Sequence, residues 1–106
     1  MEKKLFKLNE DGIAEWIVAE SKEQAYEYAK NLWGEDTMKE YADEYFSGNP
    51  DGTLESFIDE FVIEEPEDKE FTIYDAGENG MPVTKIVAEW LKDVQEVPLW
   101  FCCENF

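Results

Sequence analysis

The chain has 106 residues and a formal net charge of −18, from 27 acidic residues against nine lysines, with no arginine and no histidine. This composition leaves no basic surface for phosphate or for anionic lipid, so we expect neither direct nucleic-acid binding nor membrane binding. Hydrophobic residues make up 43% of the chain, which is enough for a packed core, and we expect one domain over residues 1–106.

The first third of the sequence predicts a β-hairpin followed by a helix. Residues 3–8 alternate polar and apolar side chains, residues 9–12 (NEDG) are typical of a turn, and residues 13–19 predict the returning strand. Ser21 then has the features of an N-cap with Gln24 three residues later, and an apolar stripe of helical period predicts a helix over 22–33.

The rest of the sequence predicts three more helices and further strands. The first of these helices is expected over 38–47, with Asp36 or Thr37 as its N-cap. A short helix capped by Thr53 is expected next, and the last helix is expected over 83–94. Strands are expected at 62–63, 70–75 and 98–103. The predicted fold class is α+β, a small and mostly antiparallel sheet with about four helices on one face, in the order β-β-α-α-α-(β)-β-α-β.

The negative charge is concentrated in the middle of the chain. Residues 35–70 contain 14 acids and two lysines, a net charge of −12, against −2 for residues 1–34 and −4 for residues 71–106. Acids spaced three or four residues apart share one helix face and mildly destabilise it. The candidate partner-binding residues are these clustered acids: Glu40, Asp43, Glu44, Glu55, Asp59, Glu60, Glu64, Glu65, Glu67 and Asp68.

Two interpretations of this charge remain open. A solvated acidic surface keeps a protein soluble and has no further role. Alternatively, rows of carboxylates a few ångströms apart imitate the phosphates of nucleic acid, which carries one charge per about 1.7 Å of duplex axis. The absence of arginine and histidine favours imitation, because no strongly cationic group interrupts the field.

The sequence offers no motif for catalysis, metal binding or a cofactor. Without histidine there is no Ser-His-Asp or Cys-His arrangement and no histidine ligand for a metal. Cys102 and Cys103 are adjacent and lack the spacing of a redox or zinc pair, and loops around Gly52 and Gly80 lack the closing glutamate of a calcium-binding EF-hand. We therefore expect a protein that is not an enzyme and has no cofactor.

These features together suggest a class of proteins. A short, lysine-only and strongly acidic domain with clustered carboxylates and aromatics resembles the DNA-mimic inhibitors of phages and mobile elements, mainly anti-CRISPR and anti-restriction proteins. The resemblance implies an inhibitor that binds a basic nucleic-acid-binding protein, such as a CRISPR effector, in the cytoplasm of a bacterial host. The cytoplasm is also expected because no signal peptide and no membrane-spanning apolar run is evident.

The alternative function is that of an adaptor or regulatory protein. Its partner would bind the aromatic C-terminal strand, for example by adding a strand to the edge of the sheet.

Overall fold

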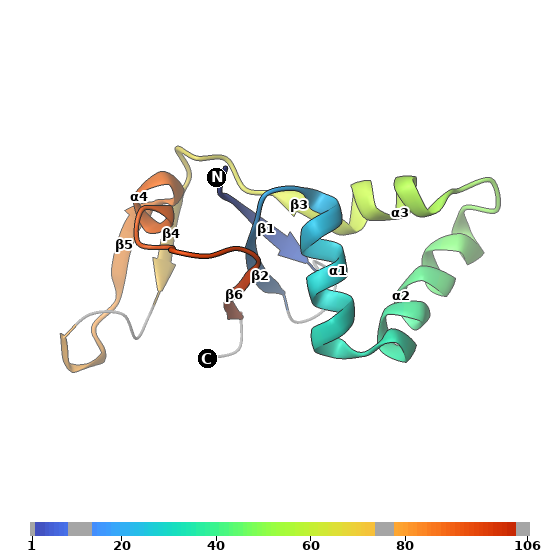
Figure 1. Ribbon diagram of the computed structural model, residues 1–106, viewed down its shortest axis with the longest axis horizontal. Coiled ribbons are helices and arrows are strands. Elements are labelled where there is room, and N and C mark those ends of the chain that lie inside the picture. Colours follow the sequence, from blue (N-terminus) through green and yellow to red (C-terminus); the bar gives the residue numbers. More distant parts are fainter. Residues whose placement is uncertain (1, 9–13, 74–77, 104–106) are drawn as a thin grey trace.

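The computed structural model describes residues 2–8, 14–73 and 78–103 and shows an α+β fold (Figure 1). Four helices, a four-stranded antiparallel sheet and a two-stranded sheet confirm the predicted fold class. In chain order the elements are β1 Lys4–Leu8, β2 Glu15–Ala19, α1 Lys22–Trp33, α2 Glu35–Gly48, α3 Leu54–Phe61, β3 Val62–Glu64, β4 Glu70–Ile73, a 3₁₀ turn Glu78–Gly80, β5 Val83–Ile86, α4 Val87–Leu91 and β6 Leu99–Cys103.

The main sheet has the strand order β3-β1-β2-β6, and every neighbouring pair is antiparallel. Leu5 pairs with Val18 and Phe6 pairs with Ile17, so successive residues of β1 and β2 point to opposite faces. All four of these side chains are buried. The sheet is therefore covered on both faces.

The first face packs against α1, α2 and α3. Phe6, Leu8 and Ile17 of the sheet form one core cluster with Ala25 and Ala29 of α1 and with residues of α2 and α3. The two alanines let α1 lie close to the strands. Of α2, only Met38 is buried, so α2 lies at the rim of this core.

The second face packs against α4 and aromatic residues of the β4–β5 hairpin and β6. Leu5 and Val18 form a separate cluster here with Val87 and Leu91 of α4, and Trp16 and Phe71 pack against it. The prediction that all helices lie on one face is therefore wrong. The reason is that β1 and β2 have apolar side chains at both odd and even positions. A strand of that kind points apolar side chains to both faces of the sheet and is covered on both sides.

The predicted helix over 83–94 is also wrong in its first part. Val83–Ile86 is strand β5, which pairs antiparallel with β4, and only Val87–Leu91 is helical. The segment begins with the β-branched residues Val83 and Thr84, which favour a strand, and the hydroxyls of Thr72 and Thr84 lie 2.6 Å apart across the pair. The expected strand over 70–75 includes β4, and residues 74 and 75 lie outside the described ranges.

The helix ends follow the predicted caps at two of three positions. At the start of α1, the Ser21 hydroxyl accepts a hydrogen bond from the backbone N–H of Gln24 at 3.1 Å. At α3, Thr53 and Ser56 form a reciprocal capping box. Helix α1 has the predicted bounds. Helix α2, in contrast, begins at Glu35 after Gly34, with no side-chain cap, so the caps expected from Asp36 or Thr37 are wrong.

Candidate functional site

The two helices with clustered acids, α2 and α3, form one end of the molecule (Figure 1). We call α2, α3 and the loop between them, residues 35–61, the acidic arm. It contains nine acids and one lysine. Figure 1 shows that α2 and α3 lie at the opposite end of the long axis from α4 and the β4–β5 hairpin. The molecule measures 48 Å along that axis.

Helix α2 separates its apolar and acidic residues onto different sides. Met38 faces the core, whereas Glu40, Asp43 and Glu44 are exposed. These three acids follow the spacing i, i+3 and i+4 and so form a row on the solvent side of the helix. Lys39 Nζ lies 3.8 Å from Asp43, and both side chains are exposed, so this ion pair is weak.

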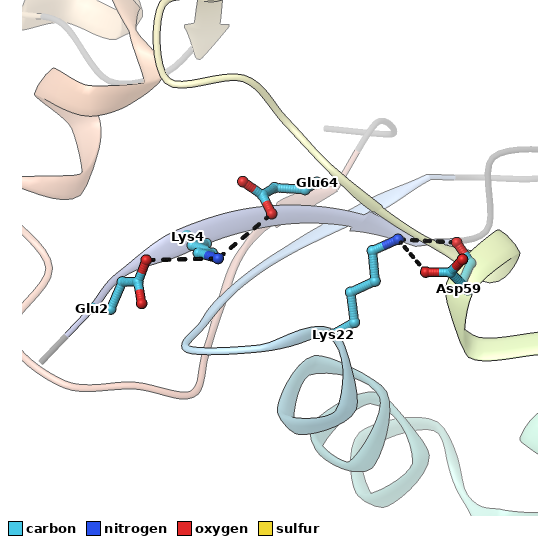
Figure 2. Close-up of polar contacts among 5 residues, drawn as sticks. All are labelled: Glu2, Lys4, Lys22, Asp59 and Glu64. Atoms are coloured by element: carbon cyan, nitrogen blue, oxygen red, sulfur yellow. Dashed lines mark hydrogen bonds and ion pairs between the residues drawn. The ribbon is translucent and has the colours of Figure 1, made fainter. Parts of the chain in front are cut away.

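Helix α3 continues the acidic surface, but one of its three acids serves the fold. Phe57 and Ile58 are buried, and Glu55, Asp59 and Glu60 are exposed. Lys22 at the start of α1 donates to Asp59 Oδ1 at 3.0 Å and to the Asp59 carbonyl at 3.1 Å (Figure 2). Asp59 thus joins α3 to α1 and is partly neutralised.

The acids after α3 separate into different environments. Glu64 in β3 is half exposed and lies 3.8 Å from Lys4, which also contacts Glu2 at 3.6 Å (Figure 2). Glu67 and Asp68 are exposed in the turn before β4. Figure 1 shows this turn on the side of the sheet away from α2. The ten candidate residues therefore do not form a single patch.

Glu65 is a correction to the candidate set, since its side chain is only 5% exposed. Its carboxylate accepts a hydrogen bond from Lys69 Nζ at 2.6 Å, and its backbone N–H donates to the carbonyl of Leu5 at 2.8 Å. A carboxylate so enclosed cannot reach a partner's groove. Its role is to fix the turn after β3.

The Glu65–Lys69 pair gives a stability prediction. We expect Lys69→Met to lower the free energy of unfolding by about 1–3 kcal/mol, because it leaves a buried carboxylate without its cation. The matched control is Lys39→Met, whose partner Asp43 is exposed, and we expect a change below about 0.5 kcal/mol. Urea unfolding followed by circular dichroism measures both. Equal losses in the two variants would show that burial of Glu65 has no energetic consequence.

Six of the ten candidates remain exposed and have no ion pair among the described residues. They are Glu40, Glu44, Glu55, Glu60, Glu67 and Asp68. Four of the six lie on the acidic arm. The sequence interpretation also missed Glu35, Asp36 and Asp51, which are exposed on the same arm. Glu35 and Asp36 were omitted because the helix was expected to begin at residue 38.

A network of aromatic rings supports the arm. Phe57 stacks on Phe61 with ring centroids 5.1 Å apart and contacts Tyr45 at 5.4 Å. Phe61 contacts Tyr41 at 5.4 Å and Trp33 at 6.1 Å, so rings from α1, α2 and α3 meet. The Tyr45 hydroxyl also donates to Ser56 at 2.9 Å. These contacts hold the two acidic helices in a fixed relative position.

Comparison with protein-family models, with curated proteins and with solved structures found no match.

The described residues show little that is typical of other kinds of site. Among residues 2–8, 14–73 and 78–103, no group of three acids or cysteines is placed to hold a metal ion. No helix within those ranges is both long and apolar enough to cross a membrane. A hollow of about 350 Å³ between α1 and α3 is lined mainly by polar and charged residues, unlike the mostly apolar sites of small ligands. The exposed acids of the arm remain the strongest candidate.

Proposed function

We propose that the chain is a non-enzymatic inhibitor that occupies the basic nucleic-acid-binding groove of a bacterial defence protein, such as a CRISPR effector, and so excludes the nucleic acid. The observation that carries this proposal is the set of unpaired, exposed carboxylates on α2 and α3. A groove built to neutralise phosphates attracts such carboxylates by the same electrostatic forces.

The spacing of the carboxylates supports imitation of phosphates. Glu40 and Glu44 are one helical turn apart, which is about 6 Å along the helix axis. Phosphates along one strand of a duplex are separated by about 3.4 Å of axis, so neighbouring helix carboxylates match every second phosphate approximately. Two acidic helices fixed by one aromatic network present such charges over a larger surface than one helix provides.

The repulsion between the acids of this surface, which destabilises the helices, also supports a function. Like charges at i and i+4 destabilise a helix by about 0.2–0.5 kcal/mol per pair. The acidic arm has nine acids and one lysine, although solubility alone needs a smaller imbalance. The chain thus tolerates repulsion within these two helices, and binding to a basic groove would relieve that repulsion. The proposed place of action is the cytoplasm of the bacterial host, where such effectors act.

A competition experiment tests the proposal. The chain is added to a guide-loaded Cas9-type effector with labelled target DNA, and to a restriction enzyme with its DNA, and retained DNA is measured. We expect DNA binding to one of these proteins to fall as the chain is added. We also expect the affinity between chain and effector to decrease linearly with salt on logarithmic axes, as for phosphate contacts. An affinity unchanged between 50 mM and about 200 mM salt would exclude charge imitation.

A further inference from the structure

Helix α2 can open without breaking the helix on either side of it. The N–H of Gly34 donates to the carbonyl of Lys30 at 2.9 Å and closes α1, and the capping box of Thr53 and Ser56 begins α3. Gly34 alone joins α1 to α2, and its φ of 98° is one that other residues rarely adopt. Each end of α2 is therefore a boundary at which the neighbouring helix is already completed by its own hydrogen bonds.

Little apolar burial holds α2 to the rest of the molecule. Met38 is the one buried residue among the 14 of this helix. Tyr41 and Tyr45 are half-buried and contact rings of α1 and α3, namely Trp33 at 5.9 Å and Phe57 at 5.4 Å. Figure 1 shows α2 beside α1 and α3 at one end of the molecule. An element with few buried contacts opens at a lower free-energy cost than the core of a domain.

Glu40 is the centre of the repulsion within α2. Asp36 precedes it by four residues, and Asp43 and Glu44 follow it by three and four residues, so all three acids are its neighbours on the helix surface. The four side chains are exposed. Asp43 lies 3.8 Å from Lys39, whereas Glu40 has no ion pair among the described residues. Every pair of acids with this spacing in α2 includes Glu40, so neutralising its charge relieves all of these repulsions.

The neighbouring helices bring little positive charge to α2. Both lysines of α1 already have acidic partners, since Lys22 contacts Asp59 at 3.0 Å and Lys30 contacts Glu27 at 3.0 Å. The hydrogen bond with Glu27 is the main cause that raises the pKa of Lys30, and the charge of Glu35 at the start of α2 contributes least. Helix α3 contains three acids and no lysine, and the last turn of α2 contains no basic residue. Positive charge that stabilises α2 must therefore come from outside the chain.

We infer that α2 is a charge-controlled switch, which opens at low ionic strength and closes when cations neutralise the carboxylates around Glu40. In the closed state the rings of α2 pack against α1 and α3 as described above. In the open state α2 leaves them and unwinds, because an isolated helix of 14 residues is marginally stable in water. A basic surface that contacts Glu40 orders the helix. The switch is a property of the isolated chain, so this inference does not rest on the proposed function.

Hydrogen exchange of the isolated chain tests the inference. The exchange rates of the α2 amides are compared with those of the β1 amides in about 10 mM and about 0.3 M salt. We expect salt to slow exchange in α2 roughly threefold relative to β1, because the charges around Glu40 are then screened. Octalysine, added at the lower salt concentration, should also slow exchange in α2 more than in β1. Equal slowing in α2 and β1 would overturn the inference, because salt would then act on the whole domain.

Two substitutions separate the repulsion around Glu40 from the net charge of the chain. Glu40→Gln and Glu60→Gln each remove one exposed carboxylate, and glutamate and glutamine have similar helix propensities. Within α3, Glu60 has no acid three or four positions away. At low salt we expect Glu40→Gln to slow exchange of the α2 amides roughly three- to tenfold, and Glu60→Gln to change it less than about twofold. Equal effects of the two substitutions would overturn the inference, and so would α2 amides that exchange no faster than those of β1 at low salt.

Discussion

Replacing Glu40, Glu44 and Glu60 by lysine is expected to weaken binding to the inhibited effector by about 100-fold or more. These three carboxylates are exposed on α2 and α3 and have no ion pair among the described residues. Each reversal replaces an attraction to the basic groove by a repulsion. The affinities are measured at about 0.1 M salt by titration calorimetry.

The matched control reverses Glu89, Asp93 and Glu96, which are exposed in and after α4. Both sets change the formal net charge from −18 to −12. Figure 1 places α4 at the opposite end from the acidic arm, on an axis of 48 Å, and charges in 0.1 M salt are screened over about 10 Å. We expect the control to lose less than about threefold in affinity. Equal losses in two folded variants would leave the acidic arm as a solvated surface without a specific role.

The choice of carboxylates shows what the sequence could and could not predict about the site. Helical spacing correctly placed Glu40, Asp43 and Glu44 on the exposed side of α2, because the apolar residues of the same helix define the opposite side. The spacing of residues within a helix could not show that Lys22 of α1, which is 37 positions earlier in the sequence, contacts Asp59. It also could not show that Glu65 is buried. Both facts depend on how α1, α3 and the turn after β3 meet in space.

The fold was predictable where one local pattern decided it. Ser21, Thr53 and the apolar stripes fixed α1 and α3, since caps and periodicity act within a few residues. The segment 83–94 was different, because Val83, Ile86, Val87 and Trp90 also satisfy a helical period. Pairing of β5 with β4, whose paired residues lie farther apart in sequence than one helical turn, converts the first four positions into a strand. The covering of the second sheet face by α4 is a tertiary property of the same kind.

Replacing Phe57 by alanine is expected to lower the free energy of unfolding by about 3–5 kcal/mol, the largest loss that we predict for a single substitution. Phe57 is 2% exposed and lies at the centre of the aromatic network. Its ring contacts Tyr26 of α1 at 6.0 Å, Tyr45 and Phe46 of α2 at 5.4 and 6.2 Å, and Phe61 of α3 at 5.1 Å. The cavity left by the ring would lie between all three helices.

The loss of stability in Phe57→Ala should also be larger in some parts of the molecule than in others. Helix α2 buries only Met38, so ring contacts are a large part of what holds it to α1 and α3. We therefore expect hydrogen exchange in Phe57→Ala to accelerate more for the amides of α2 than for those of β1 and β2. These two strands are also held by the core cluster on the second face of the sheet, which does not include Phe57. Leu54→Ala, at a position 53% exposed on the same helix, is the control and should cost below about 1 kcal/mol. If Phe57→Ala accelerated exchange equally in α2 and in the sheet, the acidic arm would unfold only with the whole domain, and its carboxylates would have the rigidity of the sheet itself.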